Sequence, residues 1–152
     1  MSTPIIELIA EVIKGRLETV ELVDTVTRPR RINSESAGDR KITLTQASRT
    51  INRELSCQGN PPGVAFDQVF VIAGELRPSE ESEDSIDTLR NLFESQIRAA
   101  LTEPSNWHTM DGYAIDSEIG ASRKYISDSG AAVLIDLLVR YRHSELDDTV
   151  QR

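Results

Sequence analysis

Residues 131–142 read AAVLIDLLVRYR, and this segment decides the fold class. Apolar residues occupy every second position up to Tyr141, while Asp136, Arg140 and Arg142 lie among the positions between them. A period of two is that of a β-strand with one face in a core and the other toward water. The segment therefore predicts a sheet on which other elements pack.

Two further strands are predicted near this one. Tyr113, Ile115 and Ile119 recur at period two, and a turn follows before residue 131. Residues 64–76 carry apolar side chains at both odd and even positions. Such a pattern is typical of a central strand, so we expect this strand to be covered on both faces.

Two amphipathic helices are also predicted. The first spans residues 4–17, with Thr3 as N-cap and Pro4 at the first helical position. The second spans residues 82–101, because acidic residues cluster at its start and apolar residues recur at helical spacing. Each helix has one apolar stripe, which indicates packing against a single surface.

The remaining N-terminal part is less regular. Residues 19–27 alternate and predict a strand that Pro29 closes, and the polar residues 30–40 predict a turn or loop. Residues 42–44 predict a short return strand. Residues 47–62 match no regular pattern and end in the break NPPG.

The resulting element order is α-β-β-β-α-β-β. It predicts an α+β fold, with a mixed, mostly antiparallel sheet and two main helices packed on it. We expect a single domain over residues 1–143 and a flexible C-terminal tail over residues 144–152. At 152 residues the chain is long enough to bury a core without disulfides or a structural metal.

Composition narrows the class of protein. Hydrophobic residues make up 38% and charged residues 28% of the chain, and the net charge is −8. An acidic chain is unsuited to general nucleic-acid binding, which needs a basic face. We see no signal peptide and no apolar run long enough for a membrane span, so we expect no membrane partner and synthesis in a reducing cytoplasm.

The sequence carries no recognisable catalytic or metal-binding motif. Cys57, His108 and His143 are the residues of metal-ligand type, and their spacing matches no ligand pair. Nucleophile-elbow and phosphate-loop motifs are also absent from the sequence. We therefore expect no catalytic residues, no cofactor and no metal, and an enzyme of unrecognised type stays an alternative.

A basic cluster at Arg28, Arg30 and Arg31 is the most distinctive polar feature. Guanidinium groups bind carboxylate or phosphate through paired hydrogen bonds. The cluster could lie in a solvated loop, contact nucleic acid, or pair with an acidic face of a neighbouring subunit. Among the functional alternatives we favour the subunit contact, since the rest of the chain is acidic.

A connection with large apolar side chains is the second distinctive feature. Trp107 and Met110 follow the second predicted helix and precede the next strand. Such residues either tuck under the domain or anchor a partner. Trp107 and Met110 therefore join the arginines as candidate subunit-interface residues.

The pattern as a whole resembles the tail-terminator, or tail-completion, proteins of tailed bacteriophages. The resemblance rests on the N-terminal helix 4–17, the proline-containing approach to the apolar strand 60–76, the helix 82–101 and the final strand 133–142. That final strand ends in the aromatic–basic pair Tyr141–Arg142. The resemblance covers nearly the whole chain through an order of elements.

The resemblance implies a non-enzymatic virion protein located in the tail or neck. Its copies would form a ring, in this family a hexamer, at the head-proximal end of the tail. That ring would stop tube growth and dock the capsid connector, so its partners would be tail-tube and head–tail connector proteins. Genomic DNA would only pass through the lumen, where an acidic wall prevents sticking.

Two other functions stay open from sequence. Another neck or head-completion adaptor protein would carry the same signals. A small nucleic-acid-binding α+β module that uses Arg28, Arg30 and Arg31 is the alternative from a different class.

Overall fold

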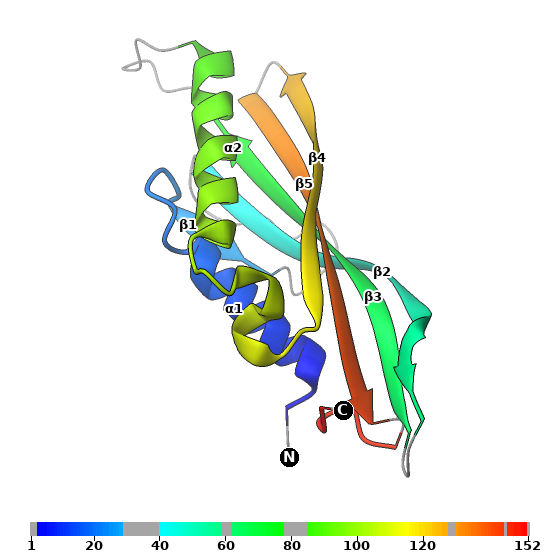
Figure 1. Ribbon diagram of the computed structural model, residues 1–152. Helices are drawn as coiled ribbons and strands as arrows, with labels where there is room; N and C mark the ends of the chain where they lie inside the picture. The colour runs from blue at the N-terminus through cyan, green and yellow to red at the C-terminus, as the bar shows by residue number, and fades with distance from the viewer. Residues whose placement is uncertain are drawn as a thin grey trace.

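The computed structural model describes residues 3–28, 40–58, 62–77, 85–127, 130–144 and 146–151 (Figure 1). Its elements are α1 (Ile5–Leu17), β1 (Thr25–Thr27), β2 (Arg40–Cys57), β3 (Gly63–Leu76), α2 (Ile86–Thr102), a short 3-10 helix η1 (Trp107–Gly112), β4 (Asp116–Ser127) and β5 (Gly130–Ser144). The α+β class and the predicted order of helices and strands are confirmed.

In the described part of the chain, the strands form one five-stranded sheet in the order β1-β2-β3-β5-β4. Only β1 pairs in parallel, with β2, so the sheet is mixed and mostly antiparallel as predicted. β3 takes the central position. It pairs with β5 without interruption from Gly63–Ser144 to Leu76–Ala131.

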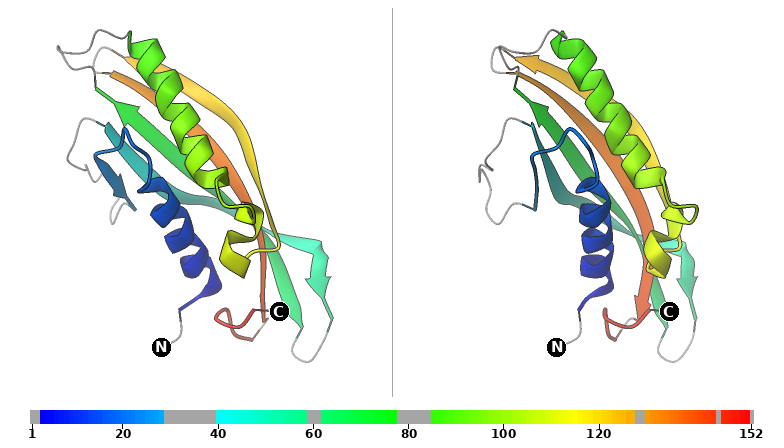
Figure 2. Two further views of the ribbon diagram at one scale, coloured as in Figure 1. Left: turned by 60° about the vertical axis from the view of Figure 1, so that its left-hand side comes forward. Right: turned by 90° about the vertical axis from the view of Figure 1, so that its left-hand side faces the viewer.

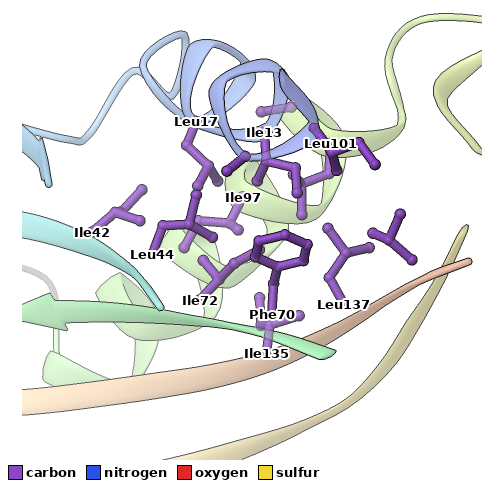
Figure 3. Close-up of a cluster of buried hydrophobic side chains, with 14 of the residues drawn as sticks. Ile13, Leu17, Ile42, Leu44, Phe70, Ile72, Ile97, Leu101, Ile135 and Leu137 are labelled. Atoms are coloured by element: carbon purple, nitrogen blue, oxygen red, sulfur yellow. The ribbon is translucent and has the colours of Figure 1, made fainter. Parts of the chain in front are cut away.

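The core lies between the sheet and the helices α1 and α2, which cover the same face of the sheet (Figures 1 and 2). Figure 3 shows how side chains from both helices meet those of β2, β3 and β5. Phe70 on β3 and Leu137 on β5 are fully buried there. Gly74 lets α2 approach closely, because a Cβ at that position would lie 2.9 Å from the ring of Phe93.

Both helices form where the apolar stripes predict them, with different first residues. The N-cap of α1 is Pro4 rather than Thr3, and no side chain in the described residues caps it. The α2 helix starts at Ile86, where the hydroxyl of Ser85 accepts a hydrogen bond from the backbone N–H of Thr88. The predicted start at residue 82 is outside the described residues.

The N-terminal strand prediction is wrong over most of its length. Only Thr25–Thr27 forms a strand, and the chain turns between Leu17 and Val23. Val20 is buried in those turns, and Leu22 and Val23 pack against the core. These apolar residues alternate with polar ones because they are loop residues whose side chains pack into the core, and not because they form a strand.

The strand β2 is far longer than the predicted short segment, because residues 45–57 continue it. Ile42 and Leu44 are buried under the helices, whereas residues 45–51 are exposed. This half of β2 extends with β3 beyond α1 in Figure 1. It lacks a covering layer among the described residues, so it shows no alternation that the sequence could reveal.

Irregularities interrupt both outer partners of the central strand pair. Register shifts occur between Gln46 and Arg49 in β2 and between Ile119 and Ser122 in β4. Gln46 and Ile119 lie in the same row of the sheet, since both connect to the pair Phe70–Leu137. Such β-bulges increase the local twist, in agreement with the strong twist at mid-sheet in Figure 1.

Residues 146–151 lie beside the N-terminus of α1. The backbone N–H of Ile5 donates to the carbonyl of Asp148 at 3.0 Å, and that of Ser144 donates to Val150 at 2.7 Å. Gln151 donates to the carbonyl of Gly112 at 2.6 Å. The mobility predicted for this tail stays a prediction. Within the described residues, no helix has the length and apolar character that a membrane span requires.

Candidate functional site

An apolar strip on the helix-free face of the sheet is the candidate functional site, and we call it the open face. It is formed by the residues of β3 and β5 that point away from the helices: Val69, Val71, Ala73, Leu134 and Leu138. The register places Val69 beside Leu138 and Ala73 beside Leu134. All of these side chains are half-buried, whereas the neighbours that alternate with them are buried.

This finding corrects the prediction that β3 is covered on both sides. Within the described residues, α1 and α2 lie on one face only (Figure 2). A sheet with one solvated face ordinarily carries polar side chains on that face. Apolar residues on the open face depart from that pattern.

Ion pairs border the open face on the same side of the sheet, and one of them reaches into it, because Asp136 lies between Leu134 and Leu138 on β5. Lys41 on β2 contacts Glu75 on β3 at 3.3 Å, and Arg123 on β4 contacts Asp136 on β5 at 2.9 Å. The members of each pair are cross-strand or diagonal neighbours. We call these groups, together with Arg140 and its carboxylates, the charged rim.

Arg140 contacts the acidic side chains at one end of the charged rim. Its guanidinium contacts Glu118 at 3.2 Å, Asp116 at 3.3 Å and Asp67 at 3.7 Å. The hydrogen bond to Glu118, together with the charges of all these carboxylates, raises the pKa of Arg140 above its ordinary value despite some desolvation. One cation facing three carboxylates leaves this corner negative, so it can accept a further basic group.

Exposed apolar residues also lie at opposite ends of the sheet edges. Ile51 on β2 is 61% exposed, and Ile126 on β4 is 58% exposed. In the register of the sheet, Ile51 lies in the same row as Tyr141 of β5, and Ile126 pairs with Ala131 of β5. The two isoleucines therefore lie about 30 Å apart along the strand direction. Two different patches on one subunit are what a head-to-tail contact needs.

Arg28 binds acidic side chains of its own chain, and its predicted contact with a second subunit stays a prediction. Its guanidinium binds Glu7 on α1 at 2.8 and 3.2 Å and Glu11 at 3.3 Å. The hydrogen bond with Arg28 holds the pKa of Glu7 below its ordinary value. The acidic partners of Arg28 in the structure lie on α1 of the same chain. Arg30 and Arg31 are outside the described residues.

The predicted contact through Met110 is also corrected. Met110 is fully buried, and Trp107 is half-buried and packs against the core. The connection therefore tucks under the domain, which was the alternative to an anchoring role. Trp107 meets the ring of His108 edge-on, with centroids 5.0 Å apart. Whether the exposed part of Trp107 contacts a partner stays a prediction.

Arg16 holds this connection in place, and sequence analysis missed it. From α1 its guanidinium donates to the carbonyl of Trp107 at 3.0 Å and to Asp111 at 3.2 Å, and its side chain is 9% exposed. These bonds stabilise a left-handed stretch, since Met110 and Asp111 have φ of 47° and 57°. Nothing around Arg16 in the sequence distinguishes it from a solvated helical arginine.

Within the described residues, no group of three His, Cys, Asp or Glu side chains is arranged to hold a metal ion. Cys57 lies near the end of β2 and is half-buried. His143 lies on β5, with β3 between that strand and β2, and stacks near Phe66 at 5.0 Å. His108 belongs to η1.

Comparison of the sequence with models of known protein families finds no match, and comparison with curated proteins finds no match either.

Proposed function

We propose that this protein is a non-enzymatic structural subunit whose copies assemble with one another through the open face. The observation that carries the proposal is the apolar strip on the helix-free face, which ion-paired side chains border and, at Asp136, interrupt. An apolar centre with a polar border is the usual anatomy of a protein–protein interface. The apolar side chains provide binding energy, and the rim sets orientation and partner choice.

A closed ring is the assembly that best fits these contacts between copies. The open face and the edge patches at Ile51 and Ile126 are different surfaces, so a contact between unlike surfaces is available. Head-to-tail contacts of this kind generate a ring when the rotation between subunits closes.

Within this class we propose a tail-terminator ring, located in the virion at the head-proximal end of a phage tail. The order of elements on which the resemblance rests is the order found in the fold. A net charge of −8 suits a lumen through which DNA passes without sticking. In this role the ring, a hexamer in the family resembled, stops tube growth and docks the connector. Another neck adaptor protein is the alternative within the class.

The nucleic-acid-binding alternative is weakened by the ion pairs of Arg28. Its guanidinium is shared between Glu7 and Glu11, so its charge is already neutralised within the domain. A phosphate would have to compete with both carboxylates for it.

Negative-stain electron microscopy and analytical ultracentrifugation of the purified chain, alone and with tail tubes, test the proposal. We expect rings for the wild type and monomers for Val71→Lys, which places a charge in the centre of the open face. Asp136 is the cross-strand neighbour of Val71, so the new ammonium has a partner and the fold is retained.

Leu92→Lys is the matched control, because Leu92 is 46% exposed on α2, on the opposite layer. It should assemble like the wild type. Absence of rings both alone and with tail tubes would contradict the assembly proposal. Equal assembly of Val71→Lys and wild type would contradict the assignment of the open face.

A further inference from the structure

A groove on the helical layer, away from the open face, is not used by the proposed assembly. It runs where the C-terminal ends of α1 and α2 meet (Figure 1). One part, of about 550 Å³, is lined by the loop at Thr19–Glu21 and by α2. A second part, of about 340 Å³, continues between α1 and the start of η1. Thr19, Ala100 and Glu103 line both parts, so the groove is continuous.

The groove is shallow and its floor is apolar, because the residues that form the floor have small side chains. Val12 and Gly15 of α1 line the second part together with Ala100 of α2, and Ala99 of α2 lines the first part. A Cβ added at Gly15 would meet no described atom within 4 Å. Glycine inside a helix costs about 0.5–1 kcal/mol relative to alanine. Packing within the described chain therefore gives no reason for glycine here, whereas close approach of a partner would give one.

The rim of the groove is acidic. Glu103 is the C-cap of α2, and the last turn of that helix has no basic residue. A carboxylate at the negative end of a helix dipole is unfavourable. Among the described residues, neither Glu103 nor Glu21 has a hydrogen-bond or ion-pair partner. Glu11 and Asp111 add carboxylates at the other end, where Arg28 and Arg16 contact them.

Gly15 and Glu103 thus each lower the local stability of a helix, and both line the same groove. Local choices that conflict with the fold commonly mark functional positions. The acidic rim favours an occupant with cationic side chains, and the apolar floor favours an occupant with apolar side chains. The amphipathic helix with a basic flank satisfies both conditions, and it binds grooves between helices as a common mode of recognition.

We propose that this groove binds a basic amphipathic helix of a different protein. The occupant presents apolar side chains to Val12, Gly15 and Ala100 and Lys or Arg side chains to Glu21 and Glu103. The helices of a second copy do not fit, because α1 and α2 each carry as many acidic as basic residues and neither is a basic helix. The proposal goes beyond the assembly role and does not require it, since the groove is on the helical layer.

Nuclear magnetic resonance titration of the ¹⁵N-labelled full chain tests this. The probe is a synthetic Leu–Lys peptide with all leucines on one helical face, used at physiological salt. We expect shift changes at the amides of Gly15, Val20, Ala99 and Glu103. Gly15→Leu fills the floor, and Glu103→Lys reverses the rim charge, so each should weaken binding about tenfold or more.

The matched controls are Ser95→Leu, an exposed position of α2 outside the groove lining, and Glu18→Lys, on the exposed C-cap of α1. Both should bind the peptide like the wild type. Spectra of the free variants verify that each is folded, and Glu103→Lys removes an unfavourable charge, so it keeps the test valid if Gly15→Leu is disrupted.

Three results would overturn the proposal. They are equal affinity of wild type and both groove variants, equal affinity for a Leu–Glu peptide of the same pattern, and no shift changes along the groove in excess peptide. None of them depends on whether the protein forms rings, so the two proposals fail separately.

Discussion

Arg16 shows how one side chain can hold an irregular connection. It leaves α1 beside the buried Ile13 and Leu17, and its guanidinium bonds the carbonyl of Trp107 and the carboxylate of Asp111. Consecutive non-glycine residues in the left-handed region are strained, so the connection needs such external bonds. The same guanidinium ties α1 to the turn that precedes β4.

We expect Arg16→Met to lower the free energy of unfolding by about 2 kcal/mol, because buried hydrogen bonds from a charged donor are lost. Urea unfolding measures the change. Arg123→Met is the control, since Arg123 and Asp136 are both about half exposed and surface pairs contribute about 0–1 kcal/mol. Equal effects of the two substitutions would contradict the role given to Arg16.

Glu94 provides a prediction about pH. Burial raises the pKa of Glu94, but hydrogen bonds from Ser122, Arg98 and Lys124 outweigh burial and lower the pKa below its ordinary value of 4.5. A carboxyl whose pKa is lower in the folded than in the unfolded state stabilises the fold above the unfolded pKa. That stabilisation is lost as the pH falls through the folded pKa.

We therefore expect the free energy of unfolding to decrease as the pH is lowered from about 5 to 3. Glu94→Gln removes the ionisable group, so its stability should depend less on pH over that interval and be lower than that of the wild type at neutral pH. Urea titrations at a series of pH values measure both. Identical slopes for the two proteins would show that Glu94 contributes nothing.

At the scale of elements, α2 is positioned by a missing side chain. Gly74 on β3 lies under the helix, and a methyl group there would lie 2.9 Å from Phe93 Cε1 and 3.0 Å from Ile97 Cδ1. Both side chains are fully buried and close-packed, so they have little room to yield.

We expect Gly74→Ala to destabilise the protein by about 1–2 kcal/mol through overpacking. Gly15→Ala is the matched control. The added methyl group meets open space there, and the substitution replaces a glycine inside a helix by alanine. That control should gain about 0.5–1 kcal/mol. Thermal and urea unfolding of both variants measure these changes, and a neutral Gly74→Ala would mean that α2 shifts freely.

The strand β2 illustrates why element lengths were harder to predict than element types. Its buried start at Ile42 and Leu44 alternates, and the prediction stopped where alternation stopped. From Thr45 onward the strand is held by backbone pairing to β3, as in the pairs Thr50–Asp67 and Ile51–Phe66. Pairing of this kind leaves no hydrophobic pattern, because backbone groups are the same in every residue.

At the scale of the whole molecule, stability should fall from the sheet centre to its ends. β3 and β5 pair along their full length and carry the largest buried side chains, Phe70 and Tyr141 among them. The half of β2 beyond Thr45 is exposed, and after Asn52 its register is irregular. Local opening is governed by such differences in burial and pairing.

Hydrogen exchange of the whole protein measures this gradient. We expect the slowest amides at the centres of β3 and β5 and fast exchange in residues 53–57 of β2. Comparable protection in both regions of the free subunit would contradict the gradient. Assembly through the open face would slow exchange further at Val69 and Leu138, and a change of protein concentration separates this contribution.

The candidate site was only partly predictable. The apolar residues on the second face of 64–76 were evident, but the sequence favoured a covering layer that the described structure does not place there. Arg28 and Met110 were singled out by residue type. Their partners, Glu7 for the one and the core for the other, lie far from them along the chain, so local patterns could not identify those contacts.

Periodicity within the sequence alone determined the α+β class, the two helices and the central strands, because burial of one face imposes a repeat on the residues themselves. The tertiary structure decided which face of the sheet the helices cover, which arginine is neutralised and where a groove opens between α1 and α2. Those outcomes depend on contacts between residues distant in sequence, whose spacing leaves no mark on any single segment.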